Sequence, residues 1–195
     1  MKVKICGVMS AEDAAMCETL GADALGFVHF PGKKRHLPLE KIAEIVDSLG
    51  PLTASVVVCA PKSVTEALDF VKRSHADIIQ SYSLSPEDLK CLSDQGESVI
   101  RAVPPVRSYA SRYSEVVDAL LFESGSPGTG TTYDYSDIPI DCCPKTIIGG
   151  GLKPDNVQKV KALQPYALDV SSGVESTPCK KDPALVAEFI RRCRE

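Results

Sequence analysis

The sequence predicts an α/β fold, a single-domain (β/α)8 barrel over residues 1–195. Eight short apolar runs alternate with helical patterns from one end of the chain to the other. Several of these runs are almost continuously apolar, which is typical of parallel strands that are covered on both faces. An open doubly wound sheet is the alternative, but eight strands without an obvious edge strand favour the closed TIM barrel.

The expected strands are the eight apolar runs, at residues 3–6, 24–30, 54–59, 77–82, 98–103, 119–123, 146–149 and 167–170. Most of the segments between them carry helix start signals, in which a capping residue or a proline precedes the apolar positions. These signals are, in order, Ser10-Ala-Glu-Asp13, Pro38-Leu-Glu40, the capping box Ser63-Val-Thr-Glu66, Ser85-Pro-Glu87, Pro154-Asp-Asn156 and Asp182-Pro-Ala184. The apolar sets that follow the last two signals are Val157, Val160 and Leu163, and then Leu185, Val186, Phe189 and Ile190.

The length of the chain limits the size of these units. Eight βα units in 195 residues average about 24 residues each, below the usual size for such a barrel. We therefore expect one or two helices to be short or replaced by loops. The candidates are residues 104–115 after the fifth strand and the Gly/Thr-rich residues 124–132 after the sixth.

Composition excludes several classes of protein. The chain is 44% hydrophobic and 25% charged with a net charge of −4, which is ordinary globular composition and not that of a disordered chain. The acidic balance gives no reason to expect nucleic acid or an anionic membrane as a partner. No apolar stretch approaches the roughly 18 residues of a membrane span, and the first residues do not resemble a secretory signal. We expect a cytoplasmic protein.

The eight cysteines do not indicate a disulfide scaffold or a metal site. Most are scattered singly, no CxxC pair exists, and the three histidines do not have zinc-ligand spacing. Most of these cysteines are expected to be small buried hydrophobes. Cys6, at the end of the first strand, is singled out below.

Two glycine-containing turns follow the seventh and eighth strands, Ile148-Gly-Gly-Gly-Leu152 and Asp169-Val-Ser-Ser-Gly173. Their backbone N–H groups can cradle a phosphate, and barrels commonly hold one at this position. The predicted phosphate-binding residues are Gly150, Gly151, Ser171, Ser172 and Gly173. The alternative is that the glycines serve only as tight turns.

Chemistry in a barrel is expected at the carboxyl ends of the strands. Cys6 and Glu123 end the first and sixth strands, where a thiolate could act as a base and a desolvated carboxyl as an acid. The alternatives are a buried Cys6 and an ion-paired or solvated Glu123. Arg35 could pair with a substrate carboxylate or be a solvated loop charge. The loop around Gly128-Thr-Gly130 could close over substrate or be a flexible connection.

These residues match a known family. The sequence resembles phosphoribosylanthranilate isomerase, a (β/α)8 enzyme of tryptophan biosynthesis, in segments that cover nearly the whole chain. The matching segments are Val3-Lys-Ile-Cys-Gly7, Gly21-Ala-Asp-Ala-Leu-Gly-Phe27, Pro31 to Arg35, Asp118-Ala-Leu-Leu121, Gly128-Thr-Gly130 before Tyr133-Asp134, Gly150-Gly-Leu-Lys-Pro-Asp-Asn156, Asp169-Val-Ser-Ser-Gly-Val-Glu175 and Lys181-Asp-Pro183.

The resemblance implies a cofactor-free Amadori rearrangement of N-(5-phosphoribosyl)anthranilate to 1-(2-carboxyphenylamino)-1-deoxyribulose 5-phosphate. Cys6 occupies the general-base position and Glu123 the general-acid position. Arg35 and Asp169 match positions near the anthranilate, Gln80 is a further substrate-binding position, and the two glycine turns match the phosphate site. The expected partner is a small phosphosugar, with the protein a monomer or a homodimer and no metal bound.

Two positions depart from the family pattern. The acid is normally Asp, whereas this chain has Glu123, and the family usually reads Gln-Leu-His-Gly where this chain has Gln80-Ser-Tyr-Ser83. The departures keep two alternatives open. One is a related phosphosugar isomerase or epimerase with a different or broader substrate range, and the other is a non-catalytic barrel that binds a phosphate ligand.

Overall fold

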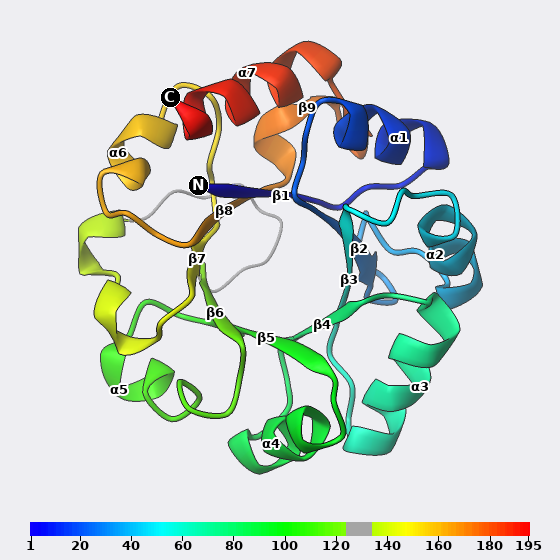
Figure 1. Cartoon of the computed structure of the whole chain (residues 1–195), viewed down its shortest axis with the longest axis vertical. Coiled ribbons are helices and arrows are strands. Elements are labelled where there is room, and N and C mark those ends of the chain that lie inside the picture. The colour runs from blue at the N-terminus through cyan, green and yellow to red at the C-terminus, as the bar shows by residue number, and fades with distance from the viewer. Residues whose placement is uncertain (124–133) are drawn as a thin grey trace.

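The molecule is built around one ring of β-strands. Successive side chains of each strand point alternately to the inside and the outside of this ring. The structure is a computed structural model, and it describes residues 1–123 and 134–195. Eight parallel strands close into a barrel in chain order, and helices surround them (Figure 1). The strands are β1 Lys2–Cys6, β2 Ala24–His29, β3 Ala54–Cys59, β4 Ile78–Ser81, β5 Ser98–Val103, β6 Ala119–Phe122, β7 Thr146–Ile148 and β8 Ala167–Val170.

The predicted barrel is confirmed, and every predicted strand is present to within one or two residues. The differences lie at the strand ends, where polar or glycine residues such as Asp77, Glu123 and Gly149 flank the apolar runs. The ring closes between the first and last strands, where Val3 pairs with Leu168 and Ile5 with Val170.

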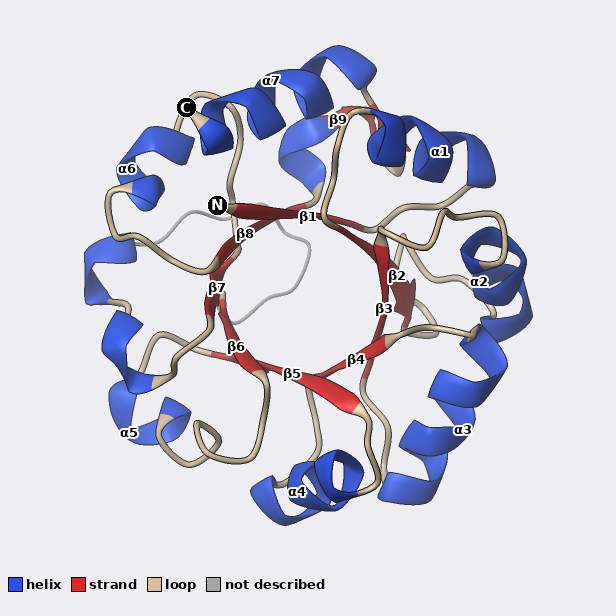
Figure 2. Ribbon diagram, in the orientation of Figure 1, coloured by secondary structure: helices blue, strands red, loops and turns tan. Residues whose placement is uncertain are grey.

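The helices form an outer layer around the ring (Figure 2). They are α1 Ala11–Thr19, α2 Leu39–Val46, α3 Val64–Ser74, α4 Pro86–Asp94, α5 Arg107–Ala110, α6 Val157–Lys161 and α7 Pro183–Arg194. Within residues 1–123 and 134–195, short 3-10 helices accompany them at η1 Tyr135–Asp137, η2 Ile140–Cys142 and η3 Ser172–Val174. The shortening expected after the fifth strand is confirmed, because α5 has only four residues. The loop around Gly128-Thr-Gly130 lies outside the described residues.

Most of the predicted helix starts are confirmed by their hydrogen bonds. Ser10 and Ser85 accept from the backbone N–H groups three residues later, and Ser85 forms a full capping box with Asp88. The box predicted at Ser63 forms only in part. Ser63 accepts from the N–H of Glu66, but the Glu66 carboxylate accepts from the N–H of Lys62 instead of closing onto Ser63.

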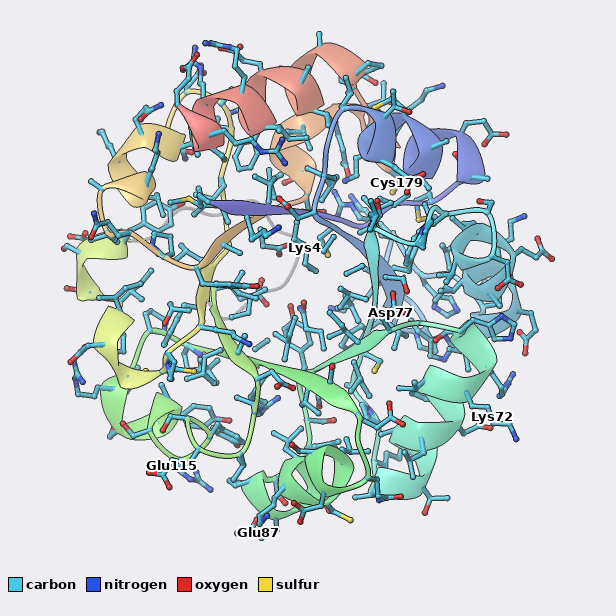
Figure 3. All side chains as sticks on the ribbon, viewed as in Figure 1. Lys4, Lys72, Asp77, Glu87, Glu115 and Cys179 are labelled. Carbon is cyan, nitrogen blue, oxygen red and sulfur yellow. The ribbon has the colours of Figure 1, made fainter. Side chains whose placement is uncertain are left out.

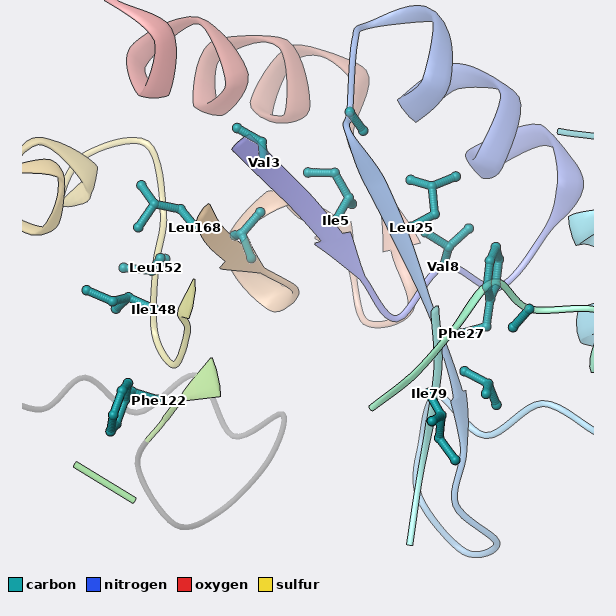
Figure 4. Packing of buried hydrophobic residues seen from close by; sticks show 14 of the residues in the cluster. Val3, Ile5, Val8, Leu25, Phe27, Ile79, Phe122, Ile148, Leu152 and Leu168 are labelled. Carbon is teal, nitrogen blue, oxygen red and sulfur yellow. The ribbon is translucent and has the colours of Figure 1, made fainter. Parts of the chain in front are cut away.

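The core lies in two layers, one inside the ring of strands and one between the ring and the helices. The outer layer is the larger and contains the large aliphatic and aromatic side chains, including Val3, Ile5, Leu25, Phe27 and Ile79 (Figure 4). The inner layer has fewer members and no buried aromatic side chain among the described residues; it consists of Cys6, Val56, Val58, Ile100, Ala102, Ala119, Leu121, Ile147 and Ala167. Alternation along each strand therefore determines which side chains reach the barrel axis.

Two details of the outer layer differ from the sequence prediction. Leu185, expected on the buried face of α7, is 37% exposed, whereas Val186, Phe189 and Ile190 are buried as expected. A short antiparallel hairpin of β9 Glu175–Thr177 and β10 Lys180–Lys181 follows β8 and was not predicted. Its strands are too short and too polar to give an apolar run.

Candidate active site

Polar side chains gather inside the barrel toward the carboxyl ends of its strands. Lys4 and Cys6 project inward from β1, because they alternate with the outward-facing Val3 and Ile5. In Figure 3, Lys4 lies within the ring of strands, whereas Lys72, Glu87 and Glu115 lie outside it, at the periphery of the molecule. The other members of this inner group are Gln80, Tyr82, Glu123 and Asp169.

A buried ion pair crosses the seam between β1 and β8. The Lys4 ammonium lies 2.8 Å from Oδ1 of Asp169, and the two side chains are only 3% and 10% exposed. Burial works against the charge on Lys4, but the charge of Asp169 and the neighbouring Cys6 outweigh it and hold the pKa of Lys4 above its ordinary value. Lys4 is therefore a permanent cation inside the barrel.

The Cys6 thiol is buried beside this pair. Burial raises its pKa above the ordinary value for cysteine, Lys4 lowers it in part, and Asp169 reinforces the rise. A thiol acts as a base when nearby positive charge lowers its pKa. Positive charge from Lys4 and Lys181 is present, but burial has the larger effect on the pKa.

Glu123 follows β6 and faces the same interior. Burial raises the pKa of its carboxyl to about 7, hydrogen bonding from Tyr82 lowers it in part, and the charge of Asp169 adds to the rise. Within the described residues, Oε1 of Glu123 forms no hydrogen bond. A carboxyl of this kind is partly protonated at neutral pH and can donate its proton to a ligand.

Tyr82 lies between Glu123 and Gln80. The Gln80 amide donates to the Tyr82 hydroxyl at 3.3 Å, and the Tyr82 ring meets Phe30 edge-on at 5.5 Å between centroids. Burial and the carboxyl of Glu123 keep the pKa of Tyr82 well above its ordinary value, so that the phenol remains a hydrogen-bond donor.

The two predicted phosphate turns lie against each other. A Cβ added to Gly173 would overlap the carbonyl oxygen of Leu152, so only glycine permits this approach. Gly150 and Gly151 have φ values of 83° and 66°, in the left-handed region that favours glycine. The carbonyl oxygen of Gly150 accepts from the Tyr135 hydroxyl at 2.7 Å, which fixes one edge of the turn.

Arg35 is held by a carboxylate of the protein itself. Its Nε and Nη2 donate to the two oxygens of Glu175 at 2.8 and 2.7 Å. Lys181, fully buried, donates to Glu175 at 2.9 Å and to the carbonyl oxygens of Cys6 at 2.7 Å and Ser171 at 3.1 Å. Hydrogen bonding with Arg35 and Lys181 holds the pKa of Glu175 below its ordinary value although burial opposes this. The Arg35 side chain is therefore ordered by Glu175 and is not a solvated loop charge.

The structure thus brings Cys6, Glu123, Gln80 and Asp169 into one interior and places the two glycine turns together beside the carboxyl end of β8. Sequence reasoning missed Lys4, Lys181 and the contact between Tyr82 and Glu123. Lys4 could have been found, since it is a charged residue on the same face of an apolar strand as Cys6.

A thiol and a partly protonated carboxyl inside a (β/α)8 barrel can act as a base and an acid, which is typical of an enzyme that transfers protons. The family model of N-(5'-phosphoribosyl)anthranilate (PRA) isomerase matches residues 3–192. The chain belongs to this family, and the family resemblance in the sequence is confirmed.

Relatives that match this chain over nearly their full length are also N-(5'-phosphoribosyl)anthranilate isomerases. The chain is 35% identical to N-(5'-phosphoribosyl)anthranilate isomerase of Geobacter metallireducens, over 100% of this chain and 99% of that protein. It is 38% identical to the enzyme of Geotalea uraniireducens, with 99% and 98% covered.

Solved structures of the same family have the same fold as this chain. Phosphoribosyl anthranilate isomerase from Thermus thermophilus superimposes with a TM-score of 0.90 at 33% identity, covering 100% of this chain and 98% of that one. A phosphoribosyl anthranilate isomerase in complex with reduced 1-(o-carboxyphenylamino)-1-deoxyribulose 5-phosphate superimposes with a TM-score of 0.88 at 31% identity, over 100% of this chain and 98% of that one.

Proposed function

We propose that this protein catalyses the Amadori rearrangement of N-(5-phosphoribosyl)anthranilate to 1-(2-carboxyphenylamino)-1-deoxyribulose 5-phosphate, a step of tryptophan biosynthesis. The observation that carries the proposal is the pair of Cys6 and Glu123, a thiol and a carboxyl with a pKa of about 7 inside one barrel. Membership of the isomerase family supports it.

Glu123 is the general acid in this proposal. Its carboxyl gives a proton to the ring oxygen of the phosphoribosyl group, the bond from that oxygen to the anomeric carbon breaks, and the anthranilate nitrogen forms a Schiff base. A pKa of about 7 keeps roughly half of the carboxyl groups protonated at neutral pH.

Cys6 is the general base. As a thiolate it removes the proton from the C2′ carbon of the Schiff base, and the electron pair moves toward the positively charged nitrogen to give an enamine. Transfer of a proton to the anomeric carbon and loss of the enol proton then give the ketose. Only protons move in this sequence, so the rearrangement needs no oxidant and no cofactor.

The two glycine turns bind the phosphate through Gly150, Gly151, Ser171, Ser172 and Gly173. Three features support this assignment: the left-handed backbone at Gly150 and Gly151, the close approach of Gly173 to Leu152, and the adjacent start of η3. Asp169, Gln80 and Arg35 bind the remainder of the substrate. Because one N–H each of Nε and Nη2 donates to Glu175, we assign the N–H groups of Arg35 that point away from Glu175, on Nη1 and the second one on Nη2, to a substrate carboxylate.

The two pKa values determine the order in which these groups lose protons. The pKa of Glu123 is about 7 and that of Cys6 lies above the ordinary cysteine value, so Glu123 ionises first as pH rises. The productive combination of thiolate and carboxylic acid is therefore a minor species.

The first test is a fluorescence assay with freshly generated phosphoribosylanthranilate. We expect wild type to consume the anthranilate fluorescence and Cys6→Ala to leave it unchanged while still binding substrate. Cys91→Ala, which removes an exposed thiol from α4, is the matched control and should behave as wild type. Undiminished turnover by Cys6→Ala would remove Cys6 from the role of base.

An inactive wild type would favour the alternatives left open by Glu123 and Tyr82. Assays of related phosphorylated aminoaldoses would then separate a phosphosugar isomerase of different range from a barrel that only binds a phosphate ligand.

The expected setting is the cytoplasm, where Cys6 stays reduced. Among the described residues, no helix is long and apolar enough to cross a membrane. The expected partner is the phosphosugar substrate alone, and the protein is a monomer or a homodimer.

A further inference from the structure

We propose that Lys4 sets how readily Cys6 loses its proton and that Asp169 acts against it, which makes Lys4 a positioning residue for the base. The role of Cys6 as the base rests on the proposed function. The electrostatic relation among the three side chains belongs to the ligand-free protein and can be measured there.

The geometry of β1 and β2 brings the ammonium and the thiol together. A Cβ built on Gly26, which pairs with Cys6 in the sheet, would lie 2.9 Å from the Cys6 sulfur and 3.1 Å from the Lys4 nitrogen. The Cys6 sulfur and the Lys4 nitrogen are therefore within about 6 Å of each other. At this distance an opposite charge changes a pKa by one or more units. The absence of a side chain at Gly26 creates the space that both groups share.

Lys181 and Arg35 also lie near Cys6, and each is paired with a carboxylate, as Lys4 is with Asp169. Lys181 lowers the pKa of the thiol less than Lys4 does. Lys181 donates to the backbone carbonyl of Cys6 rather than to its sulfur, and it is paired with Glu175. Arg35 directs two donors to Glu175. Among the residues that the structure describes, Lys4 is thus the cation best placed to act on the sulfur.

Asp169 has the opposite effect on the thiol. Its carboxylate lies 2.8 Å from the Lys4 ammonium and so weakens the effect of that positive charge on the Cys6 sulfur. It is also itself a negative charge near the sulfur, which raises the pKa of Cys6. The other groups that act on this region are Lys181 from β10, Arg35 from the loop after β2, Tyr82 after β4 and Glu123 after β6. Lys4 and Asp169 should therefore move the titration of Cys6 in opposite directions, although they form one ion pair.

This relation affects how much of the protein is in the productive protonation state. Glu123 ionises before Cys6, so the fraction with thiolate and carboxylic acid together depends on the separation between their pKa values. A cation beside the sulfur narrows that separation.

The test is a pH titration of the Cys6 thiolate in the ligand-free protein, followed by ultraviolet absorbance. Subtracting the titration of Cys6→Ala in the same background isolates Cys6 from the other seven cysteines. We expect Lys4→Met to raise the midpoint by about 1 to 3 pH units and Asp169→Asn to lower it. Lys4→Arg, which keeps the charge, should restore part of the effect.

Lys2→Met is the matched control, since Lys2 lies on the same strand but is exposed and pairs with Asp23. It should leave the midpoint unchanged. Lys4→Met leaves Asp169 buried without its cation, which can prevent folding. The double variant Lys4→Met/Asp169→Asn removes both charges. The midpoint of its Cys6 titration should still lie at a higher pH than in wild type, because Lys4 has a larger effect on the thiol than Asp169 has.

A midpoint that shifts in the same direction in Lys4→Met and Asp169→Asn would overturn the proposal and indicate a purely structural ion pair. An unchanged midpoint in the double variant would also overturn it. Neither result depends on substrate, so failure here is distinct from a failure of wild type to turn over phosphoribosylanthranilate.

Discussion

Replacing Glu123 by Gln should abolish turnover and at the same time stabilise the protein above neutral pH. Burial raises the pKa of this carboxyl from 4.5 to about 7, so the folded protein holds the proton more tightly than the unfolded chain does. The folded state then loses stability, relative to the unfolded chain, as pH rises from about 4.5 to about 7 and Glu123 ionises. Glutamine has nearly the same shape and never ionises.

The magnitude follows from the two pKa values. Each unit of pKa corresponds to 1.36 kcal/mol, so ionisation of Glu123 costs the folded protein about 3 kcal/mol at pH 8. That is a large share of the 5–15 kcal/mol by which a typical domain is stable. The cost is the thermodynamic consequence of keeping a carboxyl protonated inside the barrel.

Urea unfolding of wild type and Glu123→Gln between pH 4 and pH 8 measures this directly. We expect the difference in unfolding free energy to widen by about 3 kcal/mol in favour of the Gln variant over that range, because other titrating groups cancel between the two proteins. Glu115→Gln makes the same chemical change at an exposed side chain and should show no such trend. A difference between wild type and Glu123→Gln that stays constant with pH would refute the raised pKa and weaken the assignment of Glu123 as the acid.

Two further substitutions test the surroundings of this site. Gly173→Ala forces a methyl group into the carbonyl of Leu152, so it should raise the KM for the phosphorylated substrate and lower the unfolding free energy by about 1–3 kcal/mol; an unchanged KM would place the phosphate elsewhere. Tyr82→Phe removes a hydrogen bond that lowers the pKa of Glu123. The limb of the pH–rate profile that belongs to Glu123 should therefore move up by about 0.5 to 1 pH unit, and no shift would show that Tyr82 does not act on the acid.

The barrel was predictable because its strands are buried on both faces and their apolar runs stand out from the polar helix starts. The ends of the strands were less well defined, since polar residues such as Glu123 adjoin the apolar runs there and belong to the site. The hairpin of β9 and β10 gave no signal because its polar residues, such as Lys181, are held by ion pairs that only the folded chain creates.

The candidate site was predictable where a reactive side chain stands at the carboxyl end of a predicted strand, as Cys6 and Glu123 do. Lys4 was overlooked because a lysine in a strand ordinarily indicates an exposed face, and its burial depends on Asp169, 165 residues away. Tyr82 was noticed only as a departure from the family. Its contact with Glu123 spans two strands, β4 and β6, that are not neighbours in the ring. The two side chains at which we expected a departure from the family pattern thus contact each other, which no local pattern in the sequence reveals.

The position of Lys181 has a consequence for the order in which the protein matures. Its ammonium joins the carbonyl oxygens of Cys6 and Ser171, 175 and 10 residues away in the chain. During synthesis on the ribosome, all eight strands emerge before this side chain does. Until it arrives, the end of β1 that carries the proposed base lacks one of its hydrogen-bond donors, and Glu175 lacks one of its two cations. Completion of the reactive end of the barrel therefore requires a residue that is made after all eight strands, although Cys6 lies on the first of them.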